Sequence, residues 1–164
     1  KPNEWFRKVS LPPASTAINQ LQLEYWTQFH DFMKLRNSPV RPQKPFPQHW
    51  MNFALGKTNI VLEASINSRE KRLKVGVYIG GPDAKSYFSM LFKEKEKYEE
   101  LIGQELDWHD IQAKKHSQIY IHCLDSDPAD RSRWIEYFTW MAEQLEALAK
   151  VFRPVVKELA LPRG

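Results

Sequence analysis

The sequence predicts one α+β domain, in which helices cover one face of a curved antiparallel sheet of about five strands. Three observations indicate this class. Segments in which apolar and polar residues alternate, as in half-buried strands, follow one another across short turns. Segments whose apolar residues recur every three or four positions, as in amphipathic helices, flank and separate these groups, in the order α-βββ-α-ββ-α. The 164 residues, of which 42% are apolar and 13% aromatic, suffice for one well-packed core.

The N-terminal region is expected to be an arm followed by a helix. Residues 1–16 form the arm and end in LPPAST, where Ser15 or Thr16 can cap a helix. From Ala17 to Arg36, apolar side chains recur every three or four residues, which is typical of an amphipathic helix. Residues 17–164 would then make up a single domain.

Three strands are expected after a proline-rich connector. The segment PVRPQKPFPQ holds four prolines, so it should run extended over the surface. The segments HWMNFALG, TNIVLEASIN and RLKVGVYIGG are typical of an antiparallel meander. Their alternation predicts that Ile60, Leu62, Val75 and Val77 point into the core.

A helix, a second hairpin and a last helix complete the predicted fold. The first of these should run from a cap at Asp83 to about Ile102, with Gly103 as its C-cap. The segments LDWHD and QIYIHCL predict two strands. Pro128 would open the last helix, which Pro154 should kink or end.

The location of the protein is predicted to be cytoplasmic. No run of about 18 apolar residues could form a transmembrane helix, and the charged start KPNEWFRKVS lacks the apolar region of a secretory signal. The single cysteine, Cys123, cannot build a disulfide framework and is expected to be a small buried apolar residue. The chain does not begin with methionine, which suggests a piece of a longer protein.

Motifs of catalysis are not found in the sequence, so the chain is interpreted as a non-enzyme without cofactor or metal. It contains no Walker A loop, G-x-G-x-x-G, G-x-S-x-G or HExxH. The D/E-x-K triplet of a metal-dependent nuclease is not found on the central strands. An enzyme would require His109, Asp110, His116 and His122 to converge, although their spacing matches no compact metal site.

Basic residues are concentrated in one region of the chain. From Lys34 to Lys74, nine lysines and arginines stand against two glutamates, a net charge of +7, whereas residues 75–164 carry −3. Clustered cations of this kind neutralise phosphates and bind nucleic acid in a salt-sensitive way. The alternative is a solubilising surface or the protection of a sheet edge. The candidate nucleic-acid-binding residues are Arg41, Lys44, Lys57, Arg69, Lys71, Arg72 and Lys74.

Four stretches resemble a bacterial and archaeal family of domains of unknown function, the family numbered 4268. They are LEYWTQFHDFM, PQHWMNFALGKTNIVLEASINSREKRLKVGVYI, YFSMLFKEKEKYEELIGQELDW and DRSRWIEYFTWMAEQLEALAKVFRPVVKEL. The resemblance implies a genome-defence or DNA-processing context, because members are often fused C-terminal to a restriction-endonuclease-like domain. The start PNEWF is similar to that junction. The resemblance transfers no catalytic residue.

Two functions are carried forward. The first is a non-catalytic accessory domain of a nuclease-type or genome-defence protein, which contacts nucleic acid, DNA in the first instance, through the basic hairpin. The second is a protein interaction or dimerisation module, whose partner is a nuclease-like domain or a second copy of the chain. Its surface would be formed by aromatic side chains beyond those that the core needs, such as Trp5, Phe6, Phe46, Trp108 or Tyr120.

Overall fold

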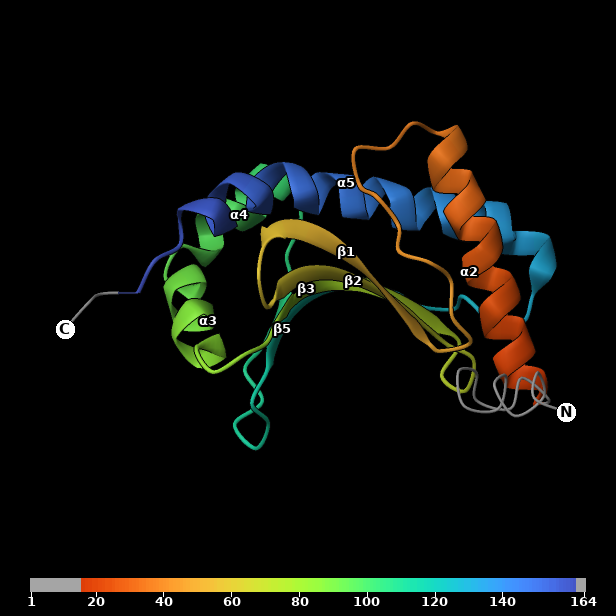
Figure 1. The fold of residues 1–164 in the computed structure, drawn as a ribbon, viewed down its shortest axis with the longest axis horizontal. Helices are drawn as coiled ribbons and strands as arrows, with labels where there is room; N and C mark the ends of the chain where they lie inside the picture. The colour runs from red at the N-terminus through yellow and green to blue at the C-terminus, as the bar shows by residue number, and fades with distance from the viewer. Residues whose placement is uncertain (1–15, 162–164) are drawn as a thin grey trace, which may run out of the picture.

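One antiparallel sheet of five strands forms the centre of the protein, and the longest helices lie on one side of it (Figure 1). The computed structural model describes residues 16–161. The strands are β1 (Trp50–Lys57), β2 (Ile60–Asn67), β3 (Arg72–Ile79), β4 (Asp107–His109) and β5 (Ser117–Cys123). Their order in space is β1-β2-β3-β5-β4. The α+β class, the meander and the second hairpin are therefore confirmed.

The first helix begins where the sequence places a cap. Helix α2 (Ala17–Leu35) follows Thr16, whose hydroxyl accepts a hydrogen bond from the backbone N–H of Asn19 at 3.2 Å. The other candidate cap, Ser15, and the rest of the predicted arm lie outside the described residues. The proline-rich connector after α2 is extended, and Pro42 forms an isolated antiparallel bridge with Phe53 of β1.

The single helix expected from Asp83 to Ile102 is two helices, which corrects the prediction. They are α3 (Ala84–Phe92) and α4 (Lys95–Ile102), and Gly103 ends the second in the left-handed region, with φ of 88°. The intervening KE sequence contains no glycine or proline that would indicate a break. The two halves pack on different elements, because α3 contacts β3 and β5 whereas Tyr98 of α4 packs against Phe152 of α5.

The last helix starts later and ends later than predicted. Helix α5 (Trp134–Glu158) follows a short 3₁₀ turn, and Pro128 lies ahead of it, where its carbonyl accepts a hydrogen bond from Nε1 of Trp134 at 2.7 Å. Pro154 does not end the helix. Phe152 and Val156 on either side of it are fully buried, so the packing of the last turn offsets the backbone hydrogen bond that proline cannot make.

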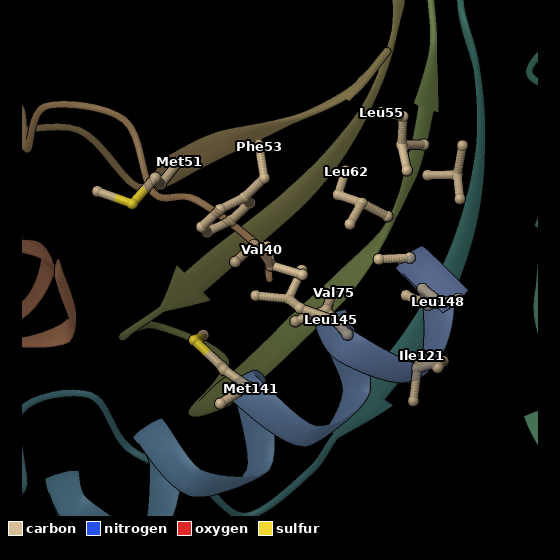
Figure 2. Packing of buried hydrophobic residues seen from close by; sticks show 14 of the residues in the cluster. Val40, Met51, Phe53, Leu55, Leu62, Val75, Ile121, Met141, Leu145 and Leu148 are labelled. Carbon is tan, nitrogen blue, oxygen red and sulfur yellow. The ribbon is translucent and has the colours of Figure 1, made fainter. Parts of the chain in front are cut away.

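The core lies between the sheet and α5. Inward side chains such as Phe53, Leu62 and Val75 point toward Met141, Leu145 and Leu148 of α5 (Figure 2). The predicted inward residues of β2 and β3 are fully buried, as the alternation requires: Ile60, Leu62, Val75 and Val77. Helix α2 crosses α5 and adds a cluster of aromatic rings to this core: Tyr25, Trp26, Phe29 and Phe32.

Two further predictions concern a membrane-spanning helix and the burial of Cys123. Among residues 16–161, no helix is long and apolar enough to cross a membrane. Cys123 is half-buried rather than fully buried, and its Sγ lies 3.3 Å from Oγ of Ser126.

Candidate functional site

The sheet face that points away from the helices carries a regular grid of polar and aromatic side chains. Because side chains alternate along a strand, these residues point opposite to the core positions of the same strands. The register aligns them in three rows: Trp50, Ser65, Lys74 and His122; then Asn52, Glu63, Gly76, Tyr120 and Asp107; then Ala54, Val61, Tyr78, Gln118 and His109. We call these three rows the open face.

The open face contains a hollow of about 530 Å³. This volume lies within the range of pockets that hold small organic groups. Strand residues form most of its wall, and the remainder comes from the β4–β5 loop and from His49, which precedes β1. Its lining residues are His49, Trp50, Asn52, Glu63, Ser65, Lys74, Tyr78, Ile111, Lys114, His116, Gln118 and Tyr120.

Gly76 occupies the middle of the open face. It pairs with Glu63 on one side and Tyr120 on the other, and Lys74 and Tyr78 flank it along β3. These four neighbours all line the hollow. A Cβ atom on Gly76 would collide with the carbonyl oxygen of Ile119 in β5, so the position requires glycine. The same requirement leaves the centre of the face without a side chain.

Two half-buried charged residues of opposite sign, Glu63 and Lys74, shape the electrostatics beside Gly76. Burial raises the pKa of the Glu63 carboxyl, and Lys74 opposes this shift. Burial also lowers the pKa of Lys74, while the charge of Glu63 acts to raise it. The Lys74 ammonium lies 3.8 Å from the centre of the Tyr120 ring, a short cation–π contact. The two charges therefore stabilise each other in a poorly solvated place.

Other groups in the hollow can donate or accept hydrogen bonds. Among the described residues, the buried Oδ1 of Asn52 has no hydrogen-bond partner. Burial lowers the pKa of His49 and of His116, so both imidazoles favour the neutral form, which carries one donor and one acceptor nitrogen. The His116 ring stacks on Tyr78 with centroids 5.0 Å apart.

One lysine holds the β4–β5 loop in place at the rim of the hollow. Nζ of Lys85 on α3 lies 2.7 Å from both Oδ1 of Asp110 and the carbonyl of Ile111. It also donates to the carbonyl of His116 and to Oγ of Ser117. With Lys85 attached to four acceptors, the loop residues that line the hollow are held against α3.

The β2–β3 turn brings together four of the seven cations selected from the sequence. Oδ1 of Asn67 accepts from the N–H of Glu70 at 2.9 Å, and the carbonyl of Lys71 accepts from Ser126 N–H at 2.8 Å, so the turn is ordered. Arg69 and Lys71 at its tip are exposed. Arg72 forms an ion pair with Glu70 at 3.3 Å. The fourth cation, Lys74, belongs to the open face described above.

The other three predicted cations lie elsewhere. Lys57 is at the opposite end of β2, about 26 Å away by the length of an eight-residue strand. Its Nζ donates to the carbonyl of Leu159 and lies over the ring of Tyr87. Arg41 and Lys44 are exposed on the connector before β1, with Lys44 over Phe46. The regional charge thus does not form one continuous patch.

The four residues of the enzyme hypothesis do not converge. Asp110 is bound by Lys85, and His116 stacks on Tyr78. His122 and His109 instead share Asp107, at 3.1 and 3.8 Å. Within residues 16–161, no group of three histidine, cysteine or acidic side chains is arranged to hold a metal ion.

The aromatic residues proposed for the interaction surface differ in their exposure. Trp5 and Phe6 lie outside the described residues. Phe46 is 41% exposed, whereas Tyr120 is buried beneath Lys74. Trp108 is half-buried and packs against Phe88 and Phe92.

The hollow contains groups that sequence reasoning did not select as a site, chiefly Trp50, Asn52, Tyr78 and Gln118. The alternation of apolar and polar residues along the strands does indicate that these side chains share the face opposite to the core. Each is an outward position on a strand whose inward positions are apolar. What the alternation cannot provide is the pairing of β5 with β3, which brings Gln118 opposite Tyr78.

Comparisons with known proteins add a family and two solved structures. The family model described as "Domain of unknown function (DUF4268)" matches residues 21–156. No curated protein matches the chain. The crystal structure of the ExsC-ExsE complex aligns at 12% identity and a TM-score of 0.40, covering 82% of this chain and 95% of that one. The HopA1-SchA chaperone-effector complex aligns at 16% identity and a TM-score of 0.35, covering 74% and 95%.

Proposed function

The chain belongs to the DUF4268 family, and from that premise we propose that it is a non-catalytic accessory domain that contacts nucleic acid through the β2–β3 hairpin. The proposal extends to its context, a nuclease-type or genome-defence protein. The resemblance supports that context, because it implies that members of the family are often fused to restriction-endonuclease-like domains. The proposal assigns no reaction to the chain, and DNA is the first partner to test.

The observation that carries the proposal is the ordered, cationic turn beside the open face. Arg69 and Lys71 extend into water from a turn whose backbone is fixed by Asn67 and Ser126. Because the backbone of the turn is already ordered, it loses little conformational entropy when its cations bind phosphates. On the adjoining hollow, Lys74 adds positive charge near the turn and Lys114 adds it at the far end, on the β4–β5 loop. Phosphates along a strand could thus be neutralised in succession.

The test removes the two exposed cations of the turn together. The variant Arg69→Ala/Lys71→Ala leaves Arg72 and Lys74 in place, because their contacts with Glu70 and Tyr120 belong to the folded structure. We expect weaker binding of labelled single-stranded and duplex oligonucleotides in fluorescence anisotropy. The slope of log K against log salt should fall by about 1.4 for single strands, at about 0.7 per lost phosphate contact.

A matched control removes the same charge elsewhere. Lys93 and Lys97 are exposed on the α3–α4 side, so Lys93→Ala/Lys97→Ala lowers the net charge by the same amount without changing the turn. We expect this control to bind like the native chain. Equal losses in the two variants would mean that only the net charge matters, and binding by neither the native chain nor the variants would remove the proposal.

A second candidate, a module that binds a second copy of the chain, is favoured by the free edge of β4. This strand pairs only with β5 in the described sheet. Beside it, Phe92 is 46% exposed and contacts the Trp108 ring. Unpaired strand edges next to apolar side chains can join two copies across a twofold axis.

Sedimentation velocity at several concentrations separates the two candidates. Pairing through β4 would shift the mass from 19.4 kDa toward twice that value as the concentration rises. The change Phe92→Asp would abolish the shift, because a carboxylate would be desolvated in the joint surface. A strict monomer at all concentrations would contradict this second candidate and leave nucleic-acid binding untouched.

A further inference from the structure

We propose that the hollow on the open face receives a base of single-stranded nucleic acid, while the β2–β3 turn holds the neighbouring phosphates. This inference rests on the proposed function and names its substrate class. It adds residues that are not among the cations of the basic hairpin, chiefly Trp50, Asn52, Tyr78 and Gln118. Four properties of the hollow support it: its shape, its rings, its hydrogen-bonding groups and the position of its cations.

The shape of the hollow suits a planar group. Gly76 leaves the middle of the open face without a side chain, and its neighbours Lys74 and Tyr78 stand along the same strand. The close approach of the β5 backbone requires glycine at this position, and the hollow therefore receives no side chain from it. The bases of a duplex are stacked inside the double helix, whereas an unpaired base of a single strand can turn outward and enter the hollow.

The rings of the hollow can stack on a base. Trp50 comes from β1 and Tyr78 from β3, and the His116 ring already stacks against Tyr78 at 5.0 Å. Stacking of a base on an aromatic side chain contributes about 1–3 kcal/mol and works with every base, because each has a π face. Sheets that present aromatic side chains on an uncovered face bind unpaired bases by this means.

The polar groups of the hollow match the edge of a base. Asn52 and Gln118 provide amides, and Glu63 provides a carboxyl group. Amides and carboxylates are the side-chain groups that pair with the donors and acceptors of bases. The buried Oδ1 of Asn52 has no partner among the described residues, which leaves an amide whose hydrogen bonds a ligand could complete after a rotation of the side chain.

The cations lie where phosphates on either side of the base would pass. Lys74 and Trp50 stand in the row of the open face nearest the β2–β3 turn, which carries Arg69 and Lys71. On the other side, Lys114 lines the hollow from the β4–β5 loop, which Lys85 holds in place. A strand crossing from the turn to this loop would meet cations before and after the base.

The test compares probes that differ only in their bases. The native chain is titrated with a single-stranded DNA oligonucleotide, its RNA equivalent and an abasic DNA strand of equal length, all in fluorescence anisotropy. We expect the strands with bases to bind about 10-fold tighter than the abasic strand, from stacking of a base. The DNA and RNA arms show whether the 2′-hydroxyl contributes.

Two variants locate this preference. In Trp50→Ala and Tyr78→Ala, we expect the 10-fold preference for strands with bases to disappear, while the salt slope stays that of the native chain. The matched control is Trp140→Ala, because Trp140 lies half-buried on α5, in the helix layer on the other side of the sheet. That control should keep the preference. Circular dichroism verifies that each variant is folded.

The outcomes separate this inference from the proposed function. If the native chain binds the abasic strand as tightly as normal strands while Arg69→Ala/Lys71→Ala still weakens binding, the hollow holds no base and the hairpin proposal stands. The same holds if Trp140→Ala loses the preference as fully as Trp50→Ala does. If no strand binds the native chain, both proposals fail. The comparison on the native chain decides the matter even if a variant does not fold.

Discussion

Replacing Gly76 by alanine is expected to destabilise the protein by about 3 kcal/mol or more, or to prevent folding. The added Cβ would collide with the carbonyl oxygen of Ile119, a backbone atom of β5 that cannot move without disturbing the ladder between β3 and β5. Domains of this size have a total stability of about 5–15 kcal/mol, so the loss would be a large share of it. Urea denaturation followed by circular dichroism measures the change.

Gly103→Ala provides the comparison for this prediction. Unlike Gly76, Gly103 stands in a backbone conformation that favours glycine, with φ of 88°, yet a Cβ there would meet nothing within 4 Å. Its replacement should cost about 1 kcal/mol, the ordinary penalty of a left-handed residue with a side chain. If the two variants lose the same stability, the collision at Gly76 is relieved by a small shift and the prediction is wrong.

Replacing Phe138 by alanine is the second change with a large expected effect. Its ring is 1% exposed on α5 and lies edge-on or tilted against Tyr25, Phe29 and Trp134. Removing a buried phenyl group forfeits its transfer free energy and leaves a cavity, a cost of about 3–5 kcal/mol. We expect a correspondingly lower urea midpoint with an unchanged slope.

Ile135 on the same helix is the matched control for Phe138. Its side chain is 67% exposed, so Ile135→Ala should change the free energy of unfolding by no more than about 0.5 kcal/mol. A loss below about 1 kcal/mol for Phe138→Ala would show that α2 and α5 repack around the missing ring. The difference between the two variants therefore measures how rigidly the aromatic cluster is packed.

The helix errors show where sequence reasoning reaches its limit. The sequence predicts Gly103 as a cap and offers Thr16 as one of two candidates, because caps act on their own backbone neighbours. The break between α3 and α4 has no such local signal, since it arises because Phe88 and Tyr98 pack on different elements. The continuation of α5 through Pro154 likewise depends on distant partners, which bury Phe152 and Val156.

The site was only partly predictable for a related reason. Arg69, Lys71, Arg72 and Lys74 are close in sequence, so their proximity on one hairpin followed from the turn alone. Lys57 joined the candidates because of its charge, but the length of β2 separates it from the turn. The hollow required β5 to insert between β3 and β4, an order that hairpin rules leave open.

The sequence by itself determined the α+β class, the inward and outward faces of each strand and the basic turn. Each of these follows from contacts between residues a few positions apart, where alternation, caps and turns act. Only the tertiary structure decided that Gly76 lies at the middle of the open face and that Trp50, Tyr78 and Gln118 line a hollow there. That arrangement depends on strand order and register, which are set when distant segments pack together.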